Sequence, residues 1–362
     1  MHSRQRSASG LGFSFPVWTV AGLLGLIACG PIGGVGADPA GSGGQGSGTV
    51  ASAGAPATGP VVLPPPPAFK VVGYWPSWVG PSFNLQVSKL NYINYAFALE
   101  NPDGTITVTP PTKPLADLVK QGHAAGARVL LSIGGWNGGD ASAFSTLSAS
   151  PTTRATFVAA VDNLMDQFQL DGIDIDWEFP RADVTASFTA LMQELSATLK
   201  PKDKLVTIAA APSSYGSEGI TADALQYIDL VNIMAYDGGN GAGHSPYALA
   251  QNSLQFWLAK GLPASKAVLG VPFYSQPGHT AYSALVGMDP SAANSDQLND
   301  QFYNGIPTIQ AKTSLAMTTG GGIMAWDLSQ DSHCPSSGCT AEAPDLSLLS
   351  AIYAASHPAA TP

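Results

Sequence analysis

Short hydrophobic segments alternate with amphipathic ones along most of the chain. Eight of the short segments are rich in β-branched residues and nearly continuous in hydrophobicity, which is typical of parallel strands buried on both faces. They occupy residues 69–75, 92–99, 128–136, 172–178, 205–212, 228–237, 267–275 and 321–328. We therefore expect one buried parallel sheet with helices between its strands.

The segments between these strands show helical spacing. After Ser150 and Pro151, an N-cap and a first-turn proline, one helical face carries Phe157, Val161, Leu164, Met165 and Phe168. A second stripe, ended by Pro201, consists of Phe188, Leu191, Met192, Leu195 and Leu199. Alternating strands and helices in this number predict a (β/α)8 TIM barrel. A doubly wound open sheet is the alternative, but neither a dinucleotide fingerprint nor a Walker A sequence is present.

The N-terminus has the pattern of an export signal. A basic start precedes an apolar run over residues 15–28, which is too short for a membrane span. The run ends in Leu-Ile-Ala-Cys-Gly, which resembles a bacterial lipobox and predicts a signal peptide over residues 1–29 with lipidation at Cys29. We expect a lipid-anchored protein at the cell surface or in the periplasm. The alternative is cleavage after Ala37, which gives a freely secreted protein.

Composition divides the rest of the chain into two parts. Residues 30–68 are rich in Gly, Pro, Ala and Ser and predict a disordered linker, which leaves residues 69–362 as the folded domain. In an exported chain, the closely spaced Cys334 and Cys339 predict a local disulfide. A metal site that uses His333 is the competing interpretation. We predict neither a metal nor a cofactor.

The charge balance limits the partners. The net charge is −10, and only 11% of the residues are charged. A negative field repels phosphate backbones, so we exclude nucleic acid and expect a neutral polymer or small molecule. We expect a monomer whose only membrane contact is the lipid anchor.

Acidic residues are concentrated in one predicted strand, "LDGIDIDWEFP" at residues 170–180. Side chains alternate along a strand, so Asp174, Asp176 and Glu178 share one face, opposite Ile173, Ile175 and Trp177. In a barrel the apolar face packs under the helices, and the carboxylates therefore point into the lumen. Asp171 is out of phase, and we interpret it as a partner of loop amides.

Three crowded carboxylates repel one another, and burial increases the cost. The pKa of at least one should therefore rise, which is what a general acid needs near neutral pH. The alternatives are a structural cluster paired with Arg or Lys and a Ca²⁺ site, but basic residues are scarce here and calcium sites usually take ligands from a flexible loop. We favour catalysis.

Residues 171–178, Asp-Gly-Ile-Asp-Ile-Asp-Trp-Glu, resemble the DxxDxDxE signature of glycoside hydrolase family 18, the chitinase family. Residues 130–136, 232–237 and 321–326 resemble its SxGG, MxYD and eighth-strand motifs in the same order. The resemblance extends over residues 69–356. It implies hydrolysis of β-1,4 bonds between N-acetylglucosamine units of chitin or chitooligosaccharides, with retention, by substrate-assisted catalysis.

The resemblance also implies residue roles. Glu178 would protonate the leaving oxygen, Asp176 would orient the 2-acetamido group, Asp174 would share a proton with Asp176, and Tyr236 would donate to the acetamido oxygen. Trp326 would form the pocket floor and Trp136 would stack the next sugar. The pocket would also be lined by Tyr74, Phe97, Met234 and Asp237, for which barrel packing is the alternative interpretation.

Two features modify this prediction. Only residues 276–320 separate the last two predicted strands, so the family's α+β insertion is expected to be reduced or absent and the groove open to endo attack. Ser275 and Gln276 stand where relatives often have Gly-Arg. The alternative functions are an endo-β-N-acetylglucosaminidase acting on N-glycans or cell-wall glycan, and a non-catalytic chitin-binding lectin, although such lectins usually lose the acid that Glu178 retains.

Overall fold

The computed structural model describes residues 63–65, 67–79, 85–108, 112–334, 339–340 and 344–358. Cys29, the predicted signal peptide and most of the predicted linker lie outside these residues. Among the described residues, no helix is both long enough and apolar enough to cross a membrane.

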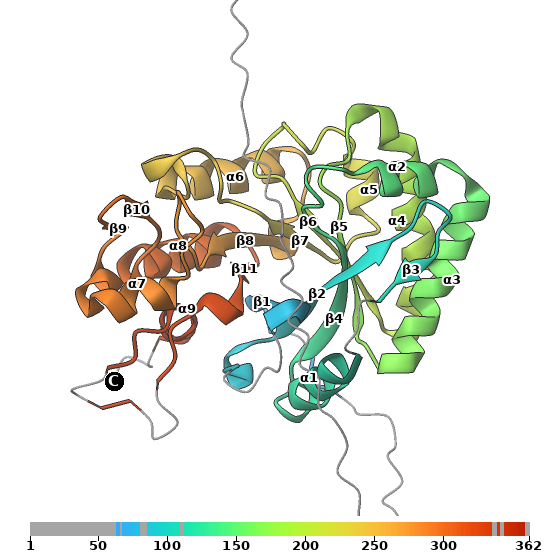
Figure 1. Ribbon diagram of the computed structural model, residues 1–362. Coiled ribbons are helices and arrows are strands. Elements are labelled where there is room, and N and C mark those ends of the chain that lie inside the picture. Colours follow the sequence, from blue (N-terminus) through green and yellow to red (C-terminus); the bar gives the residue numbers. More distant parts are fainter. Residues whose placement is uncertain are drawn as a thin grey trace, which may run out of the picture. The chain divides into compact units, whose positions relative to one another are not determined.

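Eight parallel strands form a closed barrel (Figure 1). They are β1 (Lys70–Pro76), β2 (Tyr92–Glu100), β4 (Arg128–Gly134), β5 (Gly172–Asp176), β6 (Leu205–Ala210), β7 (Leu230–Ile233), β8 (Ala267–Pro272) and β11 (Gly322–Trp326). Each strand pairs in parallel with its neighbours, and β1 closes the barrel by pairing with both β11 and β2. The predicted (β/α)8 fold is therefore confirmed.

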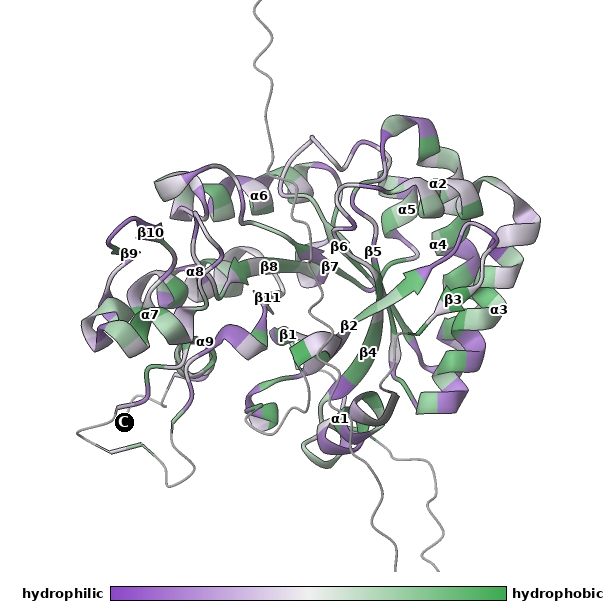
Figure 2. Cartoon of the chain, in the orientation of Figure 1, coloured by the Kyte–Doolittle hydropathy of each residue, from purple (hydrophilic) through white to green (hydrophobic). Residues whose placement is uncertain are grey.

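Helices surround the strands. They are α1 (Thr112–Ala124), α2 (Ser142–Ala149), α3 (Pro151–Phe168), α4 (Thr185–Leu199), α5 (Ala222–Leu225), α6 (Tyr247–Ala259), α7 (Tyr282–Met288), α8 (Ile306–Thr319) and α9 (Leu348–Ser356). Helix α3 begins at Pro151, where the Ser150 hydroxyl accepts a hydrogen bond from the backbone N–H of Thr152. Figure 2 shows hydrophilic and hydrophobic bands alternating along α3, as expected for a helix with one face on the barrel.

The alternation along β5 follows the predicted phase. Ile173 and Ile175 are buried in the layer between barrel and helices, together with Trp177, whose ring stacks on Phe144 of α2 at a centroid distance of 5.2 Å. Asp174 and Asp176 are also buried, on the lumen side of the strand. Burial of three large apolar side chains on the outer face fixes the register that turns the acids inward.

Several strands are shorter than predicted at their C-terminal ends. The segment expected over residues 228–237 pairs only at β7, because the chain then folds into tight turns. The backbone N–H of Ala235 donates to Ile233, and that of Tyr236 donates to Met234. These turns lift Tyr236 and Asp237 out of the sheet and onto the rim of the barrel.

The connection from β8 to β11 is short, as predicted. It contains α7, α8 and two-residue strands β9 (Gln297–Leu298) and β10 (Gln301–Phe302), which form a small antiparallel pair. Another two-residue strand, β3 (Ile106–Thr107), pairs antiparallel with the end of β2. The sequence pattern did not predict these three short strands, because two residues are too few to show a period.

Candidate active site

Asp174 lies at the bottom of the acidic row and is fully buried. Its Oδ2 accepts hydrogen bonds from the hydroxyls of Tyr74 at 2.7 Å and Ser132 at 2.8 Å. Its Oδ1 accepts from the Thr207 hydroxyl at 2.6 Å and from the Asn232 amide at 3.2 Å. Burial raises the pKa of Asp174, and these four donors oppose that rise by stabilising the charged form.

Asp176 lies one step further along the strand, toward the rim. It is 4% exposed, and its Oδ1 has no hydrogen-bond partner among the described residues. Burial raises the pKa of Asp176 well above its usual value, and the negative charges of Glu178, Asp174 and Glu100 add to the rise. The surroundings of Asp176 therefore favour a shared or retained proton.

Glu178 follows β5 by two residues and is partly exposed at the rim. Burial raises the pKa of Glu178 to about 8, and the charge of Asp237 contributes to the rise. A carboxyl group with this pKa is protonated at neutral pH and accessible to a ligand, which are the two requirements for a general acid.

Tyr236 comes from the turn after β7 and lies near the two outer acids. It is 9% exposed, and burial raises the pKa of its hydroxyl well above the usual value, followed by the charges of Asp176 and Glu178. The hydroxyl therefore keeps its proton and remains a hydrogen-bond donor beside the acidic row.

Aromatic rings form a wall next to the acids. Trp326, the last residue of β11, stacks on Phe97 with centroids 5.6 Å apart and meets Tyr74 edge-on at 5.5 Å. Phe97 and Trp326 are partly buried against the inner cluster of the barrel, as is Met234. The structure therefore brings Tyr74, Phe97, Met234 and Trp326 together with the acidic row.

Trp136 lies apart from this wall. It follows β4 by two residues, is 57% exposed, and its ring lies 6.4 Å from that of Phe179. Its exposure excludes barrel packing as its main role and leaves a flat apolar face for a ligand.

Asp237 stands at the rim with three hydrogen-bonding partners. Oδ1 lies 3.0 Å from Nδ1 of His244 and accepts from the Gln276 amide at 3.0 Å, while Oδ2 accepts from the Tyr274 hydroxyl at 2.6 Å. Partial burial opposes ionisation, but the hydrogen bonds from His244, Tyr274 and Gln276 hold the pKa of Asp237 below its usual value. Asp237 is therefore a fixed negative charge near Glu178.

The sequence analysis missed several of these supporting residues. Ser132, Thr207 and Asn232 hold Asp174, and His244 and Tyr274 hold Asp237. The strand phase could have identified the first three, because each lies on the lumen face of its strand. No comparable signal marked His244, which is on a loop.

Asp171 is separate from the row, as interpreted from its phase. Its Oδ2 accepts from the backbone N–H of Val129 at 2.8 Å and lies 2.8 Å from Nε2 of His123. These contacts join the start of β5 to β4 and α1, at the opposite end of the barrel from the acidic row.

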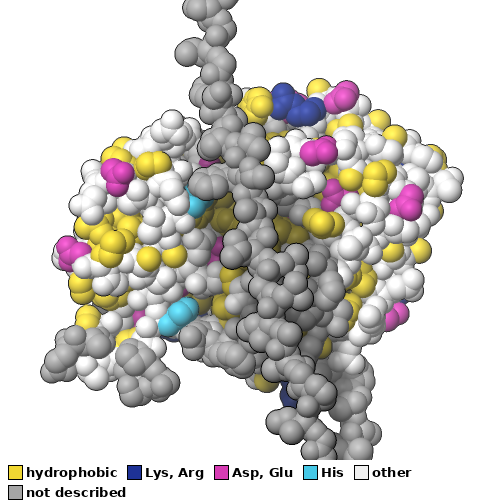
Figure 3. All heavy atoms as spheres, in the orientation of Figure 1, with side chains coloured by type: hydrophobic (Ala, Val, Ile, Leu, Met, Phe, Trp, Pro, Cys, Tyr) yellow, Lys and Arg dark blue, Asp and Glu magenta, His cyan; other side chains and the backbone are white. Residues whose placement is uncertain are grey.

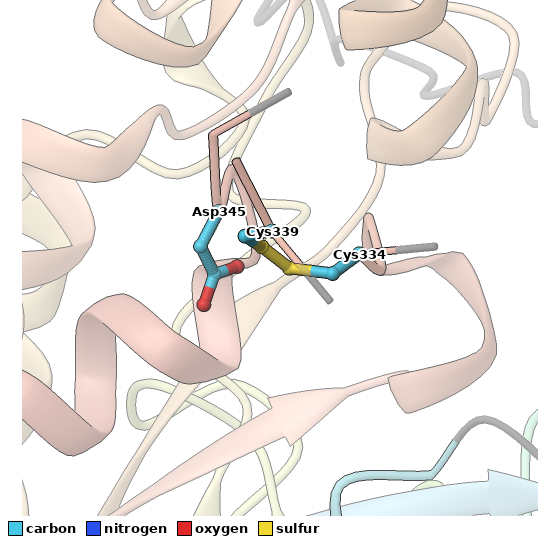
Figure 4. A group of neighbouring side chains, drawn as sticks. All are labelled: Cys334, Cys339 and Asp345. Atoms are coloured by element: carbon cyan, nitrogen blue, oxygen red, sulfur yellow. A yellow bond between two sulfur atoms is a disulfide. The ribbon is translucent and has the colours of Figure 1, made fainter. Parts of the chain in front are cut away.

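Cys334 and Cys339 form a disulfide, and a carboxylate oxygen of Asp345 lies within 4.8 Å of the sulfurs (Figure 4). Two sulfurs bonded to each other are not thiolate ligands, so this group does not offer the donor set of a metal site.

On the face shown in Figure 3, the acidic side chains are scattered and Lys or Arg side chains are scarce.

Comparison with known proteins identifies related sequences and folds. A sequence model described as "Glycosyl hydrolases family 18" matches residues 70–331. Chitotriosidase-1 of Mus musculus is 34% identical over 196 residues, which are 46% of this chain and 42% of that protein. The chain spans less than two thirds of the length of this and the other first curated relatives it matches.

Two solved structures cover most of the folded domain. The chitinase ChiB from the chitin utilization locus of Flavobacterium johnsoniae superposes with a TM-score of 0.68 at 26% identity, covering 79% of this chain and 93% of that chain. A chitinase from Bacteroides thetaiotaomicron gives a TM-score of 0.70 at 26% identity, covering 79% and 96%.

Proposed function

Since the chain belongs to glycosyl hydrolase family 18, we propose that it is a chitinase that hydrolyses β-1,4 bonds between N-acetylglucosamine units. The observation that carries this proposal is the graded row of Asp174, Asp176 and Glu178. One end of the row is fully hydrogen-bonded and buried, and the other end is a protonated carboxyl group at the rim. Relatives named as chitinases, in sequence and in structure, support the choice of substrate.

Glu178 is proposed as the general acid. Its pKa of about 8 provides a proton for the leaving glycosidic oxygen at neutral pH, and the resulting carboxylate would then accept a proton from water. Asp176 precedes Glu178 on the same side of β5, so it is badly placed to attack the opposite face of the sugar. This arrangement favours a mechanism in which the sugar's own 2-acetamido oxygen attacks the anomeric carbon, with net retention.

Asp176 and Tyr236 are proposed to hold the acetamido group. The unpartnered Oδ1 of Asp176 is an acceptor for the acetamide N–H and a countercharge for the oxazolinium ion, while the Tyr236 hydroxyl is a donor for the acetamide oxygen. Asp174, held by four donors, would take up or release the proton that Asp176 shares.

Trp326 is proposed as the floor beneath the reacting sugar and Trp136 as the stacking surface for the next one. Apolar rings suit the C–H faces of pyranose sugars, and the Trp326 ring packs on Phe97 whereas the Trp136 ring lies beside Phe179. Tyr74, Phe97, Met234 and Asp237 complete the lining. The short connection between β8 and β11 supports an open groove and therefore endo attack.

The proposed location and assembly rest on sequence and on the position of the site. We propose an exported protein with its lipid anchor at Cys29, supported by the lipobox-like segment. We also propose that it acts as a monomer, since the acidic and aromatic residues proposed for the site all belong to one closed barrel.

The decisive experiment offers chitin oligosaccharides and N-glycans side by side to the wild-type protein and to Glu178→Gln. We expect cleavage of chitin oligosaccharides with the β-anomer as first product, and a loss of about a thousandfold in kcat in the variant. Glu194→Gln, a carboxylate on α4 outside the site, is the control and should keep full activity.

Each other outcome has a definite meaning. An α-anomer as first product contradicts the acetamido mechanism, and full activity in Glu178→Gln contradicts the assignment of the acid. Cleavage of N-glycans alone favours an endo-β-N-acetylglucosaminidase. Binding of chitin oligosaccharides without cleavage of either substrate favours the lectin.

A further inference from the structure

Lys312 of α8 is a lysine whose side chain is completely enclosed by the protein. Its amine contacts three oxygen atoms, all of them in neutral groups. Nζ donates to the carbonyl oxygen of Ser245 at 2.6 Å, to the hydroxyl oxygen of Ser245 at 2.8 Å and to Oδ1 of Asn304 at 2.7 Å. Burial lowers the pKa of Lys312 to about 7, and the charge of Asp296 opposes the fall. Even an uncharged amine has two N–H donors, so at least one hydrogen bond to Ser245 is kept in either charge state.

A buried amine is a costly way to fill space. Lysine is almost never fully buried without a partner, because removal of its amine from water is unfavourable. A leucine or methionine would fill the same space without this cost. The contacts of the Lys312 amine therefore indicate what this side chain contributes.

Ser245 passes the restraint on to the turn after β7. The Ser245 hydroxyl donates to the carbonyl oxygen of Ala235 at 2.8 Å, and the same hydroxyl oxygen accepts from Lys312. Because Lys312 supplies the proton of its own contact, the hydroxyl proton stays available for Ala235. Ala235 directly precedes Tyr236 in the chain. Lys312 is therefore connected to Tyr236 through two hydrogen bonds and one peptide bond.

The turn that carries Tyr236 depends on the loop that follows it. Strand β7, with its ladder pairing, ends three residues before Tyr236. Beyond that point two hydrogen bonds cross from the turn to the following loop. One joins Ala235 to Ser245, and the other runs from the backbone N–H of Gly238 to the carbonyl oxygen of His244 at 3.0 Å. A displacement of this loop would therefore displace Tyr236.

Asn304 holds the same loop from just before the start of α8. Its Nδ2 donates to the carbonyl oxygen of Ser245 at 3.0 Å, and its Oδ1 accepts from Lys312. Ser245, Asn304 and Lys312 are all buried, so bulk water does not compete for these hydrogen bonds. The three residues thus form one closed hydrogen-bonded group, to which the turn after β7 is attached.

We propose that Lys312 is a positioning residue that, through Ser245 and Ala235, holds the Tyr236 hydroxyl in place for the acetamido group of the substrate. The proposal rests on the proposed function for its catalytic consequence, whereas the restraint of the turn stands on the contacts alone. Tyr236 would donate to the acetamido oxygen as that oxygen attacks the anomeric carbon. Misplacement of a group at this step slows the chemical step more than it weakens binding of the ground state.

The first test measures the restraint without any substrate. Lys312→Met keeps a linear side chain but has no N–H donor. We expect backbone amide hydrogen exchange in residues 235–245 to become several-fold faster than in the wild-type protein, while exchange in β7 stays the same. Hydrogen exchange followed by mass spectrometry of peptides gives both rates. Unchanged exchange in residues 235–245 of the variant would overturn the proposal.

Lys266→Met is the matched control. Nζ of Lys266 also donates to neutral oxygens, the carbonyl oxygens of Leu225 at 3.0 Å and Ile228 at 2.5 Å. Lys266, however, directly precedes β8, at the opposite end of the barrel from the acidic row. Its loss should leave both kcat and exchange in residues 235–245 unchanged. Equally accelerated exchange in both variants would mean that loss of either lysine loosens the whole barrel, which would contradict the proposal.

The second test separates positioning from a general structural role. We expect Lys312→Met to lower kcat on chitin oligosaccharides about tenfold, with a smaller change in KM. In a Tyr236→Phe background, where no hydroxyl remains to be positioned, the same substitution should lower kcat by about twofold or less. An equal loss in both backgrounds would show that Lys312 acts independently of Tyr236 and would contradict the proposal.

Ser245→Ala keeps the test decisive if Lys312→Met fails to fold. This substitution removes the hydroxyl that joins Lys312 to Ala235 and keeps the other two contacts of the amine. We expect it to lower kcat about tenfold, and by much less in the Tyr236→Phe background. Full activity in Ser245→Ala would contradict the proposed connection. If the wild-type protein cleaves no glycan, the exchange measurement still decides whether Lys312 restrains the turn, so failure of the proposed function and failure of this inference are distinguishable.

Discussion

The hydroxyl of Tyr74 on β1 donates a 2.7 Å hydrogen bond to Oδ2 of Asp174 on β5, across the lumen of the barrel. The bond joins two strands that are not neighbours in the sheet. It ties the deepest acid of the row to the opposite wall, and it favours the charged form of that acid.

Loss of this bond should be measurable in Tyr74→Phe. A hydrogen bond to a charged group contributes about 1.5–3 kcal/mol, so the pKa of Asp174 should rise further in the variant. We expect about a tenfold loss of kcat and a shift of the acidic limb of kcat to higher pH. Tyr95→Phe is the control, because Tyr95 is equally buried on the neighbouring strand and its hydroxyl has no partner among the described residues. Equal profiles of kcat against pH for Tyr74→Phe and Tyr95→Phe would contradict the role given to Tyr74.

Glu178 should make the protein less stable in alkaline solution. Its pKa is about 8 in the folded chain and about 4.3 when unfolded, so between these values the folded state holds a proton that the unfolded state does not. The stability due to this proton is fully present below about pH 4 and is lost as the pH rises through 8. Glu178→Gln removes this dependence and should be more stable than the wild type at pH 9, by about a few kcal/mol. Thermal unfolding of both proteins at pH 5 and pH 9 checks this. An equal change in melting temperature between the two pH values for the wild type and Glu178→Gln would contradict it.

Neutralising Asp237 should weaken the hold of Glu178 on its proton. The charge of Asp237 is the second cause of the raised pKa of Glu178, after burial. In Asp237→Asn that pKa should fall, so the alkaline limb of kcat/KM should move to lower pH. The measurement is a pH–rate profile on a soluble chitin oligosaccharide. Asp171→Asn serves as the control, since Asp171 lies at the other end of β5. A shift of the alkaline limb of kcat/KM to higher pH in Asp237→Asn would be inconsistent with the charge interaction.

Trp136 should contribute to binding but not to stability. Its ring is 57% exposed, so truncation leaves no cavity in the core. We expect Trp136→Ala to bind chitin oligosaccharides about tenfold more weakly, a loss of about 1.4 kcal/mol, with an unchanged melting temperature. Calorimetric titration into an inactive Glu178→Gln background checks this. Trp257→Ala, which truncates a fully buried tryptophan, should show the reverse pattern, with a large loss of stability.

The disulfide should have only a local effect. It closes a loop between residues five positions apart, for which loop-closure entropy gives about 2 kcal/mol. We expect Cys334→Ser with Cys339→Ser to lower the melting temperature by a few degrees and to retain activity. Wild-type protein with reductant should match the double variant, and a loss of chitin oligosaccharide cleavage would show that the loop has a role in the site.

The barrel and its acidic row were predictable because they depend on periodic patterns. Continuous apolar runs indicated strands buried on both faces, and the period of two along β5 placed Asp174 and Asp176 in the lumen. The same period could have assigned Ser132 and Thr207 to the lumen, but a single hydroxyl carries no chemical signal until its partner is known.

Contacts made by loops were not predictable in this way. His244 meets Asp237 because the intervening loop closes on itself through Gly238, and such geometry leaves no periodic trace in the sequence. The strand ends were overestimated for a related reason. Tyr236 and Asp237 continue an apolar run, yet turns rather than ladder pairing determine their positions.

The pairing of β1 with β11 has a consequence for the biosynthesis of the protein. On the side of β1 away from β2, residues 70–73 pair with residues 322–325, so the barrel cannot close until nearly the whole chain has been made. Until then β1 and β8 each present an unpaired edge, which is prone to association with other chains. A polypeptide that ends before Gly322 should therefore aggregate rather than fold into a smaller barrel.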